Sequence, residues 1–192
     1  MQKKCLVLAA ILSALSLSAL AQPAPPPSSS GSPVPAPRSA DYREAERAAR
    51  ELARTQYLAG IVGQSPLKAT AETLLRQAQG EYQAGQYFRA RERAHAASLV
   101  LEALRFQEVA PTAPHPAGRG GRRAYEAPFR AQEAIARAEY EADYYRVNAP
   151  AVNQLIQEAK RLLAQGNDLA RAEAAHRLAR AAHHLMKAER GF

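Results

Sequence analysis

Small and apolar residues recur along residues 40–190 at alternating spacings of three and four, with polar residues between them. Stripes of this kind run through three segments: Leu67, Ala71, Leu74, Ala78 and Tyr82; Ala90, Ala94, Ala97, Leu101 and Leu104; and Ala172, Ala175, Ala179, Ala182 and Met186. The spacing predicts amphipathic helices that pack nearly antiparallel. Because alanine is so short, we expect axial distances at the low end of the ~8–10 Å range.

Turn-forming residues divide this region into six predicted helices. The region contains no alternating β-branched run that would predict a strand. Ser65 is a favourable N-cap and Pro66 a favourable first helical residue, and Asp168 is a second candidate N-cap. The Pro- and Gly-rich residues 108–124 are predicted to form a loop. The predicted helices span about 40–59, 66–84, 87–107, 125–145, 150–164 and 169–190.

The two halves of the helical region align with each other. A shift of 81 residues places the third helix on the sixth without a gap, and a shift of 83 places the first helix on the fourth. The matches include Tyr42 with Tyr125, Tyr57 with Tyr140, Gly85 with Gly166, Glu92 with Glu173, and His95 with His176. We therefore predict an all-α fold made by tandem duplication of a three-helix unit, residues 40–107 and 125–192, packed as an antiparallel helical bundle or a short solenoid.

Two family resemblances fit this organisation. The turns at 84–90 and 165–172 locally resemble the turn and second helix of tetratricopeptide repeats. Residues 134–139 (AIARAE), 148–150 (NAP) and 168–172 (DLARA) resemble an uncharacterised bacterial domain-of-unknown-function family of exported Ala-rich helical proteins, some of them joined to a peptidoglycan-binding OmpA-like module. That resemblance covers residues 40–107 and 124–190, implies an exported helical protein, and supplies no catalytic residues.

The N-terminal segment is typical of a secretory signal peptide. Lys3 and Lys4 precede an uncharged apolar run that ends in a small-x-small site at Ala21. The run is shorter than the ~20 residues of a membrane-spanning helix, so residues 1–21 are predicted to be cleaved and the mature chain to have no transmembrane segment. Residues 22–39, rich in Pro and Ser, are predicted to be a disordered spacer.

Cleavage would also limit the chemistry of the mature chain. Cys5, the single cysteine, would be removed, which leaves neither a disulfide nor a thiol nucleophile. Loss of Lys3 and Lys4 would lower the formal net charge from +8 to about +6, which permits contact with acidic partners without requiring it.

Catalytic and metal-binding patterns are weak. Glu92, His95 and Ser98 lie three apart on one predicted helix, but a helix surface offers no oxyanion hole, and the second copy has Ala179 in place of Ser98. His176 and His183 would lie about 10 Å apart along the axis, too far to share an ion. We therefore predict no enzyme activity, no cofactor and no metal site.

Two groups of residues are candidates for contact with a partner. Arginines in the predicted loop would bind a polyanion, or would simply keep a linker soluble: Arg119, Arg122 and Arg123. Tyrosines would line a partner-binding face, or would complete the Ala-rich core: Tyr82, Tyr87, Tyr140 and Tyr144.

The sequence thus favours a non-catalytic exported protein, periplasmic or secreted, that acts as an interaction or scaffold factor with another protein of the cell envelope. The alternative is a periplasmic binder of an acidic polymer or anionic surface through the arginines. A nucleic-acid partner is not expected after export, and a homo-oligomer is compatible with the exposed helix faces.

The signal-peptide interpretation predicts that the mature protein begins at Gln22. N-terminal peptide mass spectrometry on the protein made in its own host, with cell fractionation, checks this. A species that begins at Met1 and fractionates with the membrane would contradict it.

Overall fold

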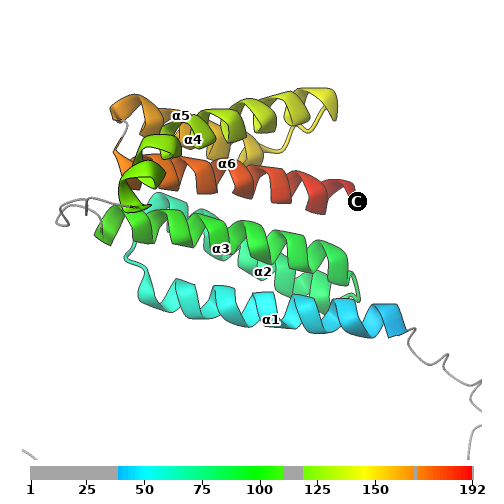
Figure 1. Cartoon of the computed structure of the whole chain (residues 1–192). Helices are drawn as coiled ribbons and strands as arrows, with labels where there is room; N and C mark the ends of the chain where they lie inside the picture. The colour runs from blue at the N-terminus through cyan, green and yellow to red at the C-terminus, as the bar shows by residue number, and fades with distance from the viewer. Residues whose placement is uncertain (1–38, 110–118, 167, 192) are drawn as a thin grey trace, which may run out of the picture. The chain divides into compact units, whose positions relative to one another are not determined.

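The computed structural model describes residues 39–109, 119–166 and 168–191 (Figure 1). These residues form six α-helices and no strand, which confirms the predicted all-α class. The predicted signal peptide and nearly all of the spacer 22–39 lie outside the described residues. The helices are α1 (Ser39–Ile61), α2 (Pro66–Gln83), α3 (Tyr87–Val109), α4 (Arg119–Tyr144), α5 (Pro150–Gln165) and α6 (Leu169–Arg190).

Both predicted N-caps are confirmed. The hydroxyl of Ser65 accepts a hydrogen bond from the backbone N–H of Lys68 at 3.1 Å, and Pro66 is the first residue of α2. The carboxylate of Asp168 accepts from the backbone N–H of Arg171 at 3.0 Å. These caps satisfy N–H groups that have no partner inside the helix, and so they determine where α2 and α6 begin.

The predicted loop 108–124 is wrong at both of its ends. Helix α3 continues to Val109, and α4 begins at Arg119 rather than at about residue 125, so the Arg/Gly segment 119–123 belongs to a helix. Gly120 and Gly121 cost a helix about 1 kcal/mol each relative to alanine, but they do not forbid it, and the three arginines that flank them are strong helix formers. Residues 110–118 lie outside the described part.

The antiparallel pair of α3 and α6 lies at the centre of the helical region, and the other helices pack on it (Figure 1). Helices α1 and α2 pack on α3, while α4 and α5 pack on α6. Ion pairs show that α3 and α6 are antiparallel. Glu92 of α3 contacts His184 of α6, whereas Glu102, further along α3, contacts the earlier Arg177 of α6. The two halves therefore share the same order of helices and neighbours, as a tandem duplication would predict.

Alanine forms much of the core between these helices. The three stripes predicted from the sequence are buried, except that Tyr82 is only half-buried. Helices α3 and α6 are buried around more of their circumference than one stripe, because each has neighbours on several sides. The additional buried apolar side chains are Ala96, Leu99, Val100 and Ala103 on α3, and Ala174, Leu178, Ala181, Leu185 and Ala188 on α6.

None of the helices in the described part is both long enough and apolar enough to cross a membrane.

Close packing of this kind predicts that enlarging one central alanine destabilises the fold. Ala182 on α6 is completely buried, so Ala182→Leu would introduce three carbon atoms where neighbouring helices already touch. We expect a loss of about 1–3 kcal/mol in the free energy of unfolding, measured by urea denaturation. Ala53→Leu, at an exposed position of α1, is the control. Equal stability of the two variants would contradict close packing at Ala182.

Candidate functional site

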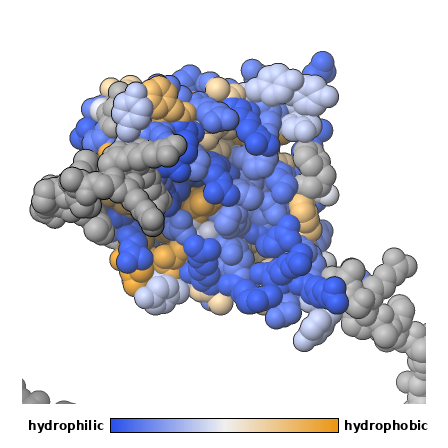
Figure 2. Space-filling view, viewed as in Figure 1, coloured by the Kyte–Doolittle hydropathy of each residue, from blue (hydrophilic) through white to orange (hydrophobic). Residues whose placement is uncertain are grey.

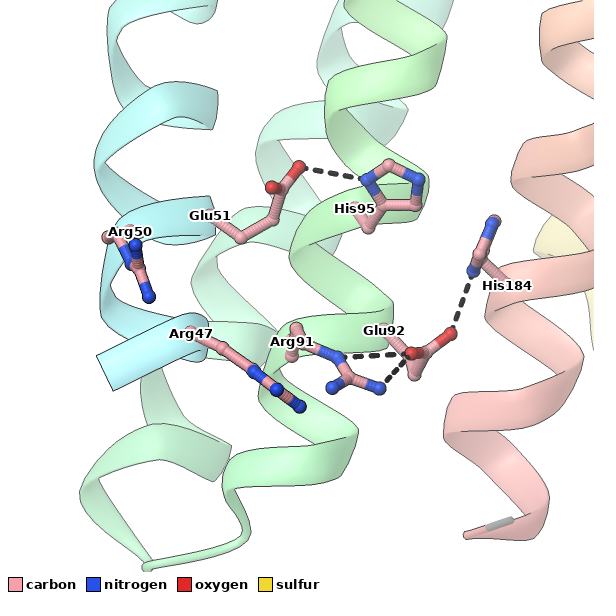
Figure 3. A pocket seen from close by; sticks show the side chains of 7 residues that line it. All are labelled: Arg47, Arg50, Glu51, Arg91, Glu92, His95 and His184. Atoms are coloured by element: carbon pink, nitrogen blue, oxygen red, sulfur yellow. Dashed lines mark hydrogen bonds and ion pairs between the residues drawn. The ribbon is translucent and has the colours of Figure 1, made fainter. Parts of the chain in front are cut away.

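A shallow hollow of about 400 Å³ lies where α1, α3 and α6 meet (Figure 3). Both signs of charge line it, so it differs from the alanine-rich core beside it. Its lining consists of Arg47, Arg50 and Glu51 from α1, Arg91, Glu92 and His95 from α3, and His184 from α6.

Glu51 joins α1 to α3 through His95 and Ser98. Nδ1 of His95 lies 2.9 Å from Oε1 of Glu51, and the hydroxyl of Ser98 donates to the same oxygen at 2.9 Å. Burial raises the pKa of the Glu51 carboxyl, but the hydrogen bonds from His95 and Ser98 outweigh it, and the net effect is a lowered pKa. Glu51 is therefore ionised at neutral pH and accepts both hydrogen bonds.

Glu92 has the most deeply buried carboxylate in the hollow. It accepts hydrogen bonds from Nδ1 of His184 at 2.7 Å and from the guanidinium of Arg91 at 2.6 Å, and Nζ of Lys187 lies 3.4 Å away. Burial acts to raise the pKa of Glu92, but the hydrogen bonds from His184 and Arg91 lower it to about 2. This buried, ionised and fully paired carboxylate links α3 to α6. Removing its partners would leave an unpaired charge in the interior, which would strongly destabilise the fold.

Three histidines form a row across the central helices. The rings of His95 and His184 meet edge to face with centroids 4.3 Å apart, and the ring of His183 lies 5.4 Å from that of His184. His183 in turn bonds Glu141 of α4. Burial lowers the pKa of His184, and the nearby His95 acts in the same direction, so His184 is neutral at pH 7.

A related arrangement occupies the matching positions of the second half. Glu173, which aligns with Glu92 in the 81-residue shift, is equally buried and accepts from Arg130 of α4 at 2.9 Å and from Arg177 at 2.6 Å. Arg130 aligns with Arg47, which lines the first hollow but pairs with Glu44 at 3.6 Å. Each half thus holds one buried glutamate on its central helix.

The geometry does not arrange Glu92, His95 and Ser98 as a catalytic relay. Ser98 is completely buried and donates to Glu51, while His95 bonds the same carboxylate and Glu92 bonds His184. A serine that donates to a carboxylate, with no free imidazole nitrogen against its hydroxyl, lacks the base that would activate it as a nucleophile. The bonds of this cluster hold helices together.

Within residues 39–109, 119–166 and 168–191, no three His, Cys, Asp or Glu side chains are placed to hold a metal ion together. His115 lies outside these ranges.

The arginines predicted to bind a polyanion lie at the start of α4. Arg119, Arg122 and Arg123 are helical, although the side chains of 119–124 are not among those described. On a helix they are held at fixed spacing along one short segment instead of moving independently as in a loop. Their role in binding stays a prediction.

The four tyrosines of the predicted partner face form two separate pairs. Tyr82 and Tyr87, at the α2–α3 turn, are half-buried with ring centroids 5.3 Å apart, and Tyr82 packs on a small cluster with Leu52 and Leu75. Tyr140 and Tyr144, near the end of α4, are exposed and stacked at 5.9 Å. The first pair is therefore partly core, whereas the second is free to contact a partner.

Other exposed aromatic residues, which the sequence did not identify as a partner face, lie on α4 beside Tyr140 and Tyr144 and on α1. All of the large exposed apolar side chains in the described part lie on α1 or α4. They are Tyr42, Tyr57 and Ile61 on α1, and Tyr125, Phe129, Tyr140 and Tyr144 on α4. The alignment of Tyr42 with Tyr125 and of Tyr57 with Tyr140 was a signal that could have identified them.

No protein-family model, curated protein or solved structure matches this chain.

The buried charges predict a loss of stability in two stages as the pH falls. Burial lowers the pKa of His184 and of His176 below 6.5, so the unfolded chain takes up protons first and stability drops below about pH 6.5. The pKa of Glu92 falls from its ordinary value of 4.5 to about 2 in the folded protein, so a second loss follows between pH 4.5 and 2. Urea unfolding monitored by circular dichroism across this range measures both stages.

Glu92→Gln isolates the second stage. The amide keeps the size of the side chain but cannot be protonated in this range. The difference in the free energy of unfolding between the wild type and this variant should therefore shrink by up to about 3 kcal/mol as the pH falls from 4.5 to 2. A difference in stability that stays constant between pH 6 and 3 would show that the paired carboxylate does not contribute in this way.

Proposed function

We propose that this protein is a non-catalytic, exported helical protein of the cell envelope that binds another protein through the exposed faces of α1 and α4. Export is supported by the N-terminal pattern of Lys3, Lys4, an apolar run and a small-x-small site. The resemblance to exported Ala-rich helical proteins agrees with it. The charged cluster inside the molecule is accounted for by its bonds between helices and needs no substrate.

One observation carries the binding proposal: the large exposed apolar side chains of the described part gather on α1 and α4. Tyrosine and phenylalanine are concentrated at protein–protein contacts because they bury a large area with few rotatable bonds. The face drawn in Figure 2 is otherwise mostly hydrophilic, with hydrophobic residues in small separate patches. Aromatic residues exposed at matching positions of both halves are not needed for the core, and a binding role explains why both halves have them.

The alternative, an anionic polymer or surface as ligand, is supported by a row of exposed arginines on α1. Arg43, Arg47, Arg50 and Arg54 follow one another at spacings of four, three and four. Arg47 pairs with Glu44, Arg50 with Glu46, and Arg54 with Glu102, so most of this row is already neutralised within the chain. We therefore favour a protein partner over an acidic polymer.

Site-specific photocrosslinking tests the binding proposal. A photoreactive phenylalanine analogue replaces Tyr57 of α1 or Tyr140 of α4, and matched controls carry it at Arg76 of α2 or Gln157 of α5, which are also exposed. In envelope extract we expect crosslinks to protein from both Tyr57 and Tyr140, with a different protein captured at Tyr57, and no crosslinks from the controls.

Salt separates the two candidate ligands in the same experiment. Crosslinks that persist at ~0.5 M salt support a protein partner, because exposed charges more than a few Å apart are screened at that ionic strength. Crosslinking to protein that is equally frequent at all four positions, or that disappears as salt rises, would overturn the proposal, and the second result would favour the anionic ligand.

A further inference from the structure

The outer face of α4 is an aromatic ridge, defined by Tyr125, Phe129, Tyr140 and Tyr144. These side chains are 74%, 59%, 68% and 67% exposed, respectively. At 100° per residue they lie roughly opposite the buried side of the helix, which is formed by Ala127, Ala131, Ile135 and Ala138. The ridge therefore points away from the rest of the chain along ~28 Å of helix.

The aromatic positions of the ridge are spaced symmetrically about its midpoint. Tyr125 and Phe129 form one aromatic pair with centroids 5.7 Å apart, and Tyr140 and Tyr144 form another at 5.9 Å. Each pair is one helical turn long. Between them the exposed positions hold smaller or charged side chains, namely Gln132, Glu133, Ala136 and Arg137. The midpoint of the ridge falls between Ala134 and Ile135, with one aromatic pair at equal distance on each side.

We propose, building on the proposed function, that the aromatic ridge of α4 binds the same ridge of a second copy of this chain, with the two helices antiparallel about a twofold axis. A twofold interface pairs each residue with its counterpart across the axis, so a surface must be complementary to itself. In this arrangement Tyr125 faces the partner's Tyr144, and Phe129 faces the partner's Tyr140. Ala136 at the centre is small enough to let the two helices approach closely.

Charge complementarity agrees with this pairing. Glu133 and Arg137 lie on opposite sides of the midpoint, so each comes within one residue, ~1.5 Å along the helix, of the position opposite the other charge on the second copy, within reach of two symmetric ion pairs. Arg137 is 70% exposed and donates to Glu141 at 2.8 Å, which leaves its other guanidinium nitrogens available to the partner's Glu133. The registers favoured by the aromatic pairs and by the charges therefore agree to within one residue.

Helix α1 provides an internal comparison that selects α4. The shift of 83 residues places Arg50 at the position of Glu133 and Arg54 at that of Arg137. Antiparallel pairing of two α1 helices would therefore bring four arginines together, and Glu46 stands where α4 has Phe129. Like charges placed across an interface oppose association. The same helix position thus offers both signs of charge for pairing between copies in the second half, and only arginines, which are already paired within their own chain, in the first.

The area of the ridge fits a reversible dimer. An aromatic side chain buries about 150–250 Å² when fully covered. With four side chains about two-thirds exposed on each copy, pairing would remove roughly 1,000 Å² of surface in total, near the lower end for specific protein interfaces. We therefore expect a dimer that forms in the micromolar range, with α1 left free for a different protein.

Sedimentation equilibrium of the purified protein over about 1–300 µM tests the dimer directly. We expect the weight-average mass to rise toward twice the monomer mass, and Phe129→Ser with Tyr140→Ser to weaken the dimer at least tenfold. The matched control is Tyr42→Ser with Tyr57→Ser, which removes two tyrosines that are each 68% exposed on α1 and should leave the dimer unchanged. Circular dichroism confirms that each variant is folded.

Charge reversal distinguishes a specific register from general stickiness. Glu133→Arg and Arg137→Glu should each weaken the dimer, because each places like charges across the axis. Combining the two restores opposite charges and should recover most of the affinity. Because Glu133 and Arg137 also attract each other within one helix, circular dichroism of each variant separates a loss of folding from a loss of the dimer.

Crosslinking reports the orientation. Ala136→Cys, in a chain with Cys5→Ser, places one thiol per copy near the predicted axis, and Ala53→Cys is its counterpart on α1, also exposed. A short bis-maleimide should link two copies through residue 136 and not through residue 53.

A purified protein that stays monomeric at 300 µM would overturn the α4 dimer. Equal weakening by the α1 and α4 variants, or crosslinking through residue 53, would overturn it too. None of these measurements uses envelope extract, so the photocrosslinks at Tyr57 decide the proposed function separately. If the protein is monomeric but still crosslinks to another protein at Tyr57, the proposed function stands, and the exposed faces of α1 and α4 both bind that other protein.

Discussion

Alanine side chains along the facing sides of α3 and α6 let these two helices pack closely, and all the other helices pack on that pair. Because alanine buries little area, each contact contributes little hydrophobic free energy, and the packing depends on many contacts at once. The central helices have neighbours on several sides, so nearly every position along them must be small, apolar or paired. This constraint explains why the buried polar residues of α3 and α6, namely Glu92, Arg93, Ser98 and Glu173, are all hydrogen-bonded.

Buried charged residues add contacts between helices beside the alanine-rich core. Glu92 and Glu173 are buried on the central helices: Glu92 is held by His184 and Lys187 of α6, and Glu173 by Arg130 of α4 and by Arg177 of its own helix. Buried ion pairs add little net stability compared with apolar residues of similar size, but a charge left without its partner is very unfavourable. A wrong helix pairing would leave these carboxylates without their partners, a cost that an interface of identical alanines alone would not impose.

The sequence predicted the helices well because the signals were local. Ser65 with Pro66 and Asp168 mark helix starts by their own hydrogen-bonding chemistry, and the alanine stripes identify the sides that are buried. The beginning of α4 was missed because Gly120 and Gly121 suggest a loop, although flanking arginines and the rest of the chain favour the helix. Glycine raises the free energy of a helix without preventing it.

The candidate site could not be predicted in the same way. His184 meets Glu92 across 92 residues of sequence, and His95 meets Glu51 across 44, and no spacing on one helix signals either contact. The sequence placed Glu92, His95 and Ser98 on one helix, but their partners come from other helices. The tyrosines were partly predictable. Tyr140 and Tyr144 were identified by their spacing, whereas Tyr82 packs on the cluster that contains Leu75, and Tyr87 contacts the ring of Tyr82.

The antiparallel contact between α3 and α6 also has a consequence for folding kinetics. Contacts within each half join helices that are close in the chain, whereas the bonds between halves close loops of about 75 to 96 residues, from Glu102–Arg177 to Arg93–Glu189. Long loops are entropically more costly to close and slow the step that forms them. Each three-helix half can therefore form early from local contacts, and the joining of α3 to α6 becomes the late step. While the chain waits for that step, α3 of one molecule can meet α6 of another, so the same contact that completes the monomer also provides a route to domain-swapped assemblies.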